Sequence, residues 1–143
     1  MVSVFDVAAH ILKRVGPLDT MKLQKLVYYS QAWSLVWDGQ PLFHESIEAW
    51  ANGPVCPELY QAHRGDFQIT SLPKGDPSIL VAEQLETIEG VLKFYGSKSG
   101  WWLSELTHRE HPWLDARNGL NPGDRGNTVI SLASMAEYYG SLA

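Results

Sequence analysis

Cysteine is nearly absent, since Cys56 is the only one in 143 residues. An intrachain disulfide and a cysteine-rich zinc site are therefore excluded, and a reducing, cytoplasmic location is expected. No apolar run approaches the roughly 20 residues of a membrane span. Asp6, His10 and Lys13 also interrupt the N-terminal segment in which a signal peptide needs its apolar centre. We expect no association with a membrane.

Positive charge is also scarce, with 11 Lys and Arg against 16 Asp and Glu and a formal net charge of −5. A phosphate backbone finds no basic face on such a chain, so nucleic acid is not an expected partner. No Walker loop, no GxGxxG after a strand, no GxSxG and no Fic-type histidine loop occurs. Hydrophobic residues make up 45% of the chain and six are tryptophan, which is ample for one packed core. We expect a single domain over residues 1–143.

The stretch from Leu18 to Gly39 predicts one long helix at the centre of the fold. Asp19 is a suitable N-cap, Leu18 and Leu23 stand where a hydrophobic staple closes, and Gly39 supplies the stop. The second half, YYSQAWSLVW, is apolar or aromatic on nearly every side, which is typical of a helix surrounded by other elements. The charged residues that we expect to mark water-facing sides are Lys22, Lys25 and Asp38.

Further helices are predicted wherever apolar residues recur at helical spacing behind a capping residue. They are Ser3 to Val15, Pro57 to Arg64, a stripe from Val81 to Tyr95 capped by Asp76, Ser99 to about Glu110, a turn or helix from His111 that Gly119 closes, and a last one capped by Ser131. Asn118 to Asn127 has the composition of a loop.

Two short segments alternate between apolar and polar residues, as strands do. They are Ser46 to Ala51 and Phe67 to Leu72, and we expect them to pair with each other. The predicted fold is therefore mainly α, with about six helices and one minor two-stranded hairpin.

Five histidines raise the question of a metal site, and His108 and His111 are three residues apart. Pro112 argues against it, because the residue before a proline tends to leave helical geometry. A third ligand would have to come from distant histidines. We expect no metal and no cofactor, and a small metal-dependent hydrolase is the least favoured alternative.

Catalytic pairs are weakly indicated. Cys56 near His63 lacks the positioned third group that activates a thiolate, and a buried small residue is the better interpretation. Glu45 and Glu48 point to opposite faces of a strand, so they do not form an acid and base pair. We predict a protein without catalytic residues.

Trp50 is the most promising binding residue. If Ile47 and Ala49 face the helices, period-two alternation turns Trp50 outward beside Glu48. An outward indole next to a rigid turn is a favoured anchor for a protein partner. The predicted patch consists of Trp50, Asn52, Gly53, Tyr60, Gln61 and Arg64, whereas Trp33 and Trp102 are expected in the core.

The opposite orientation of this strand stays open. If Trp50 is buried, the patch dissolves and the polar face of the central helix becomes the candidate surface. That face comprises Lys22, Lys25, Tyr28 and Gln31.

Three stretches together resemble the Panacea domain, also called the SocA-like antitoxin domain and earlier the phage-associated GepA-like protein. They are MKLQKLVYYSQAWSL, PLFHESIEAWANGPVCPELY and LSELTHREHPWLDARNGLNPGDRGNTVISLASMAEYY, and they follow the order of the family. Gly53-Pro54 after the tryptophan and Tyr138-Tyr139 near the end are part of the match.

The resemblance implies a mostly helical, non-catalytic protein that binds and neutralises a toxin encoded by a neighbouring gene. Members pair with unrelated toxins, among them alarmone-synthetase-like and Fic-like enzymes. An alternative within the family is an adaptor that delivers the toxin to the ClpXP protease. Many members carry a further domain or extension, and because none is evident here we expect this chain to act through its folded surface.

Overall fold

The structure, a computed structural model, describes residues 1–143 and is built mainly from helices. Its seven α-helices are α1 (Val4–Val15), α2 (Thr20–Trp37), α3 (Pro57–His63), α4 (Ala82–Tyr95), α5 (Gly100–Thr107), α6 (His111–Arg117) and α7 (Leu132–Leu142). A 3-10 helix, η1 (Pro77–Ile79), and four short strands complete it: β1 (Leu18–Asp19), β2 (Glu48–Trp50), β3 (Gly53–Val55) and β4 (Gln68–Ile69). The expected mainly α fold is confirmed.

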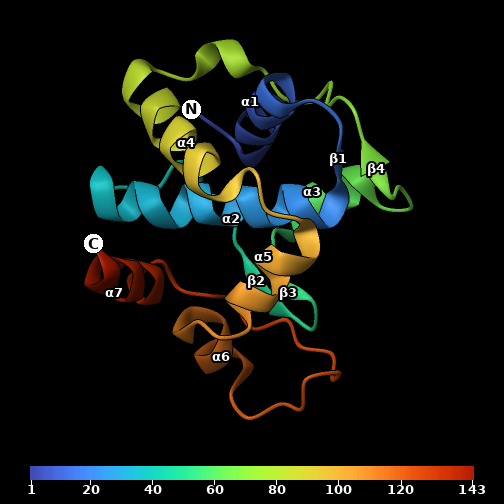
Figure 1. Ribbon diagram of the computed structural model, residues 1–143, viewed down its shortest axis with the longest axis vertical. Helices are drawn as coiled ribbons and strands as arrows, with labels where there is room; N and C mark the ends of the chain where they lie inside the picture. The colour runs from blue at the N-terminus through green and yellow to red at the C-terminus, as the bar shows by residue number, and fades with distance from the viewer.

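Helix α2 is the central element. It runs across the middle of the molecule, with α1 and α4 on one side and α5 and α7 on the other (Figure 1). Eleven of its 18 residues are buried, and these include the polar residues Gln24, Lys25 and Gln31. Because neighbours surround α2, its polar side is covered as well as its apolar side. None of the helices combines the length and the apolar character that a membrane crossing requires.

The predicted helix starts are largely confirmed by side-chain caps. The Asp19 carboxylate accepts a hydrogen bond from the Lys22 amide at 2.8 Å, and Ser3 and Asp6 form the expected reciprocal capping box. Ser99 and Ser131 cap α5 and α7. The expectation for Asp76 was wrong, because Asp76 caps η1 while α4 starts independently behind Val81.

Helix α5 is shorter than predicted. It ends at Thr107 rather than near Glu110, and Glu110 instead stands before the first residue of α6. Pro112 explains the break, because a proline ring inside a continuous helix would meet the carbonyl group four residues earlier. In the first turn of a new helix the same ring is tolerated.

The strand pairing differs from the prediction. β2 pairs with β3 in a tight antiparallel hairpin across Ala51 and Asn52, and β4 pairs with β1. Gly53 follows the two connecting residues with a positive φ of 119°, which glycine adopts readily, and the hairpin therefore closes between segments that are adjacent in the sequence. Pro54, which lacks an N–H, lies opposite Ala49, whose own N–H donates to the Thr128 carbonyl on the other side.

A buried carboxylate organises the aromatic core between α2, α6 and α7. Glu110 is 5% exposed, and its Oε1 accepts hydrogen bonds from the hydroxyls of Tyr29 and Tyr139, each at 2.7 Å. Tyr28 joins through the Tyr139 hydroxyl, and Tyr95 stacks on Tyr29 with ring centroids 4.0 Å apart. Burial raises the pKa of Glu110, although the two tyrosine hydroxyls oppose this shift.

Replacing Glu110 with alanine is expected to lower the free energy of unfolding by about 3 kcal/mol, because two buried hydroxyls lose their acceptor. Glu110→Gln keeps an acceptor oxygen and is expected to cost only about 1 kcal/mol at neutral pH. Since the folded pKa is raised, the part of the stability that comes from this pKa shift is full below the ordinary pKa of 4.5 and is lost as pH rises through the folded value, whereas the hydrogen bonds from the two tyrosines remain. Urea unfolding of both variants as a function of pH tests this, and equal losses in the two would contradict it.

Candidate functional site

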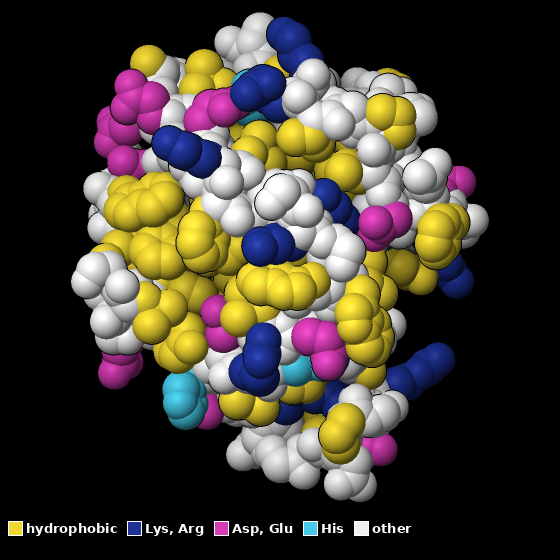
Figure 2. Space-filling model, in the orientation of Figure 1, with side chains coloured by type: hydrophobic (Ala, Val, Ile, Leu, Met, Phe, Trp, Pro, Cys, Tyr) yellow, Lys and Arg dark blue, Asp and Glu magenta, His cyan; other side chains and the backbone are white.

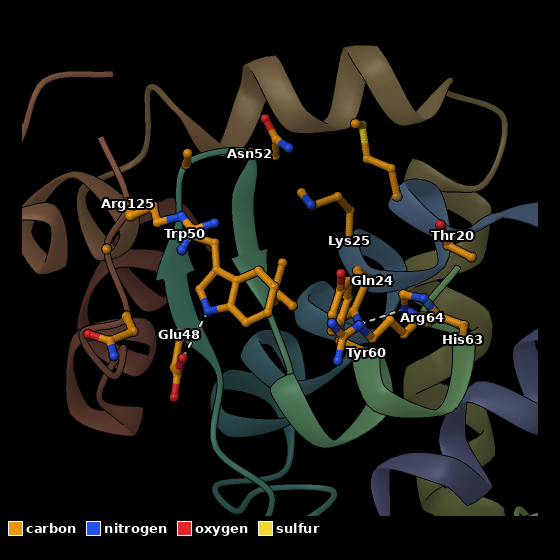
Figure 3. A pocket seen from close by; sticks show the side chains of 15 residues that line it. Thr20, Gln24, Lys25, Glu48, Trp50, Asn52, Tyr60, His63, Arg64 and Arg125 are labelled. Carbon is orange, nitrogen blue, oxygen red and sulfur yellow. Dashed lines mark hydrogen bonds between the residues drawn. The ribbon is translucent and has the colours of Figure 1, made fainter. Parts of the chain in front are cut away.

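A pocket lies between the first turns of α2, the β2–β3 hairpin, α3 and the loop before Ile130 (Figure 3). Its volume is about 790 Å³. The polar and aromatic residues that line it include Thr20, Gln24, Lys25, Glu48, Trp50, Asn52, Tyr60, His63, Arg64, Arg125 and Asn127. Residues far apart in the sequence therefore converge on one concave surface.

Trp50 has the predicted orientation. Ile47 and Ala49 are 3% and 1% exposed and face the core, whereas Trp50 is half-buried and lines the pocket. Its indole N–H donates to Glu48 Oε1 at 2.8 Å, and its ring meets the edge of Tyr60 at a centroid distance of 5.0 Å. The alternative in which Trp50 is the buried side of the strand is excluded.

Most of the predicted patch gathers at this pocket. Trp50, Asn52, Tyr60 and Arg64 line it, and Gln61 is exposed on α3 without lining it. Gly53 is buried beneath the surface, so it supports the pocket and does not offer a contact of its own.

The alternative polar face of α2 does not exist as a surface. Lys25, Tyr28 and Gln31 are each 1% exposed. Lys22 is half-buried, and its Nζ donates to the Gly96 carbonyl at 2.7 Å. The expectation that Lys22 and Lys25 mark a water-facing side is therefore wrong for Lys25 and only partly right for Lys22, because neighbouring segments cover this side of the helix.

The Lys25 side chain is instead buried and lines the pocket. It forms no ion pair, and its ammonium donates no hydrogen bond within the protein. Burial lowers the pKa of Lys25 to about 8, and the charge of Asp19 offsets only part of this effect. A lysine in this state is the kind of perturbed group that gathers at functional sites.

Gly53 makes room for Lys25. A Cβ at this position would lie 2.5 Å from Lys25 Cε, and the backbone φ of +119° is one that side chains rarely adopt. The glycine that the sequence analysis placed in a rigid turn is therefore required by both backbone conformation and close approach.

Gly53→Ala is expected to lower the free energy of unfolding by about 3 kcal/mol, from backbone strain and displacement of Lys25 together. Gly119→Ala is the matched control, since φ there is +83° and no atom lies within 4 Å of the added Cβ. The Gly119→Ala variant has backbone strain but no steric clash, and it is expected to lower the free energy of unfolding by about 1 kcal/mol. Thermal unfolding measures both, and equal losses would show that the contact with Lys25 contributes nothing.

Positive charge dominates the pocket although the whole chain is acidic. Lys25, Arg64 and Arg125 line it, and Glu48 is its only carboxylate. None of the three cations belongs to an ion pair. Low-dielectric walls around unpaired cations favour an anionic ligand.

Cys56 and His63 do not form a catalytic pair. The His63 Nε2 atom contacts the Gln24 side chain at 3.0 Å rather than the thiol, and Gln24 also accepts a hydrogen bond from the Cys56 amide. Burial raises the pKa of Cys56 to about 11, so the thiol stays protonated at neutral pH.

The histidines of the metal hypothesis lie in different surroundings. His108 stacks on Trp113, with centroids 4.2 Å apart, whereas His111 is exposed beside Asp115. No group of three or more His, Cys, Asp or Glu is placed to hold a metal ion.

Arg117 is a structural residue that the sequence analysis missed. It is 3% exposed, and its guanidinium donates to the backbone carbonyls of Ala49, Asn121 and Asp124 rather than to a carboxylate. It thereby fastens the predicted loop to β2, and the same loop carries Arg125 into the pocket wall. The sequence gives no local signal for this role, because the carbonyls that Arg117 holds include one on the distant β2.

A second surface carries exposed aromatic residues. Figure 2 shows hydrophobic side chains gathered over the carboxyl-terminal parts of α2 and α4 and over α5. Phe94 is 65% exposed, Trp101 is 71% exposed and Trp102 is 39% exposed. The prediction that Trp102 lies in the core is wrong, because its neighbour Leu103 takes the inward position on α5, and Trp33 is only half-buried.

Comparison with known protein families finds one that matches most of the chain. The family model of the antitoxin SocA-like Panacea domain matches residues 23–114, which run from α2 to α6 and include Lys25, Trp50 and Tyr60. The chain belongs to this family. The resemblance found in the sequence is thus confirmed.

One relative in the family is Antitoxin SocA from Caulobacter vibrioides (strain NA1000 / CB15N), which is 42% identical over 116 residues. The alignment covers 72% of this chain and 62% of the relative, so the chain spans less than two thirds of that protein. No solved structure matches the chain.

Proposed function

We propose that this protein is an antitoxin that binds a protein toxin encoded by a neighbouring gene and blocks the toxin's active site or substrate access. The observation that carries the proposal is membership of the Panacea family, together with similarity to a protein named Antitoxin SocA. Neutralisation by binding needs no turnover, and a stable inhibitory contact is expected to bury about 1,200 Å² or more.

The proposed contact surface is the rim of the pocket. Trp50 and Tyr60 present aromatic area, and Arg64 adds an exposed guanidinium; these residue types contribute most to protein interfaces. Asn52 and Gln61 add polar contacts at the edge. Net charge acts at longer range, since a chain of charge −5 attracts a basic toxin surface during approach.

Co-expression tests the proposal. The adjacent open reading frame is expressed alone and with this protein, colony formation is recorded, and the complex is then purified through a tag on the toxin. We expect the product of the adjacent gene to prevent colony formation when it is expressed alone. When it is co-expressed with this protein, we expect it to be harmless and to co-purify with this chain. Rescue without a complex, lost when ClpXP is removed, would replace direct binding with proteolytic delivery.

Single variants then locate the contact. Arg64→Glu and Trp50→Ala are each expected to weaken toxin binding at least 10-fold, which corresponds to about 1.4 kcal/mol or more. Lys93→Glu makes the same charge change at an exposed site beside a different, shallow pocket and is expected to bind normally. If Trp101→Ser abolishes binding while Arg64→Glu does not, the α5 surface is the contact and the pocket rim is not.

A further inference from the structure

Lys25 is a buried cation that forms no ion pair with a carboxylate of the chain. It is 1% exposed, and the carboxylate that acts on it, Asp19, is already engaged in capping α2. The nearby Thr107 hydroxyl donates to the Ser104 carbonyl and accepts no hydrogen bond from Lys25. A deeply buried ammonium that donates to no group of the protein is unfavourable for stability, and the place of Lys25 in the pocket wall leaves this ammonium open to a ligand.

The pocket gives this ammonium access to a ligand. In Figure 3 the Lys25 side chain extends from α2 toward the β2–β3 hairpin, and Arg125 and Trp50 also line the pocket. The carboxylate of Glu48 is held by the Trp50 indole N–H and does not pair with Lys25. The space around Lys25 is therefore short of negative charge.

The walls of the pocket add flat apolar surface next to the cations. Trp50 and Tyr60 meet edge to face, and both line the pocket. A volume of about 790 Å³ leaves room for more than a single ion. Its ligand is thus expected to combine an anionic group with a short or flat body.

We propose that the pocket binds an oxyanion, a carboxylate or a phosphate, in direct contact with Lys25, and that Trp50 and Tyr60 pack against the group that carries it. The oxyanion supplies the paired negative charge that Lys25 lacks. The Lys25 ammonium exchanges its contact with water in the pocket for a charge-assisted hydrogen bond to the oxyanion. The oxyanion comes either from an acidic side chain of the toxin or from a free phosphorylated molecule. Only the first source rests on the proposed function.

Inorganic phosphate is the probe for the site. It is titrated into the full-length protein and followed by two-dimensional NMR of backbone amides and indole N–H groups, against sodium chloride of equal ionic strength. We expect saturable shifts at Trp50, Asn52 and Gly53 with phosphate alone. Lys25→Met is expected to lose them, whereas Lys93→Met, the matched control, keeps them.

Two results overturn the proposal. One is a set of shifts that grow without saturation or equal those produced by chloride. The other is saturable binding that persists in a folded Lys25→Met protein, which would place the anion on Arg64 or Arg125 instead. The NMR spectrum itself reports whether each variant is folded, so loss of structure is not mistaken for loss of the site.

Purified toxin identifies the source of the oxyanion. If phosphate weakens toxin binding several-fold more than chloride does, the natural oxyanion is an acidic side chain of the toxin. If phosphate-saturated protein binds the toxin equally well, the oxyanion belongs to a separate small molecule. If the neighbouring gene product does not bind at all, the proposed function fails while the NMR result for the pocket still stands.

Discussion

Lys25→Met is expected to make the isolated protein more stable and, at the same time, less able to bind its partner. The folded pKa of about 8 lies below the ordinary 10.5, and at about 1.4 kcal/mol per pKa unit the buried charge costs about 3 kcal/mol at neutral pH. Methionine keeps most of the side-chain volume and removes the charge. Urea unfolding at pH 7 is expected to show this gain, while toxin binding and phosphate binding fall. Such opposite effects are typical of residues kept for function.

The pH dependence supplies an independent check on Lys25. Below pH 8 both the folded and the unfolded chain hold the proton, so the penalty is complete there. Between pH 8 and 10.5 the folded state releases the proton first, and the stability of the wild type is expected to rise toward that of Lys25→Met. A Lys25→Met protein that is less stable at pH 7, with a gap that does not change with pH, would mean that the ammonium is favourably paired.

Arg117→Leu is expected to lower the free energy of unfolding by at least about 4 kcal/mol and to release the loop from Asn118 to Asn127. The loop and β2 lose a buried guanidinium that donates to several backbone carbonyls, and each hydrogen bond from a charged donor is worth about 1.5 to 3 kcal/mol. Arg117→Lys is expected to restore only part of this, because a single ammonium does not span the same carbonyls.

Limited trypsin digestion measures the release of the loop. Arg125 lies within it and is exposed, so cleavage after Arg125 is expected to accelerate strongly in Arg117→Leu. Arg109→Leu removes an exposed arginine from the turn between α5 and α6 and serves as the control. Unchanged cleavage together with unchanged stability would show that the loop is held by its own turns rather than by Arg117.

The same loop connects stability to the candidate site. Arg125, Gly126 and Asn127 line the pocket, and a Cβ on Gly126 would lie 2.8 Å from Arg117 Nη1. Partner binding is therefore expected to fall in Arg117→Leu even though Arg117 does not line the pocket.

Local signals in the sequence were sufficient for most of the helices, and they favoured the outward orientation of Trp50 without deciding it. The caps at Ser3, Asp19, Ser99 and Ser131 involve partners only three residues away, so the amino-acid order decides them. The alternation around Ala49 and Trp50 is equally local, because successive side chains of a strand point to opposite faces. The motifs that identify the family could likewise be read directly from the residues.

The tertiary structure decided which polar residues are buried and which distant segments meet. Periodicity placed Lys25 and Gln31 on the polar side of α2, but the segment at Phe43 covers that side and Gln31 hydrogen-bonds its backbone. The pairing of β4 with β1 and the hold of Arg117 on its loop likewise depend on contacts across the chain. Sequence alone determined most of the helices and the family, and it favoured the outward Trp50. The positive pocket around Lys25 arises only from packing, because a side chain's burial and charge environment are set by neighbours that the local sequence does not specify.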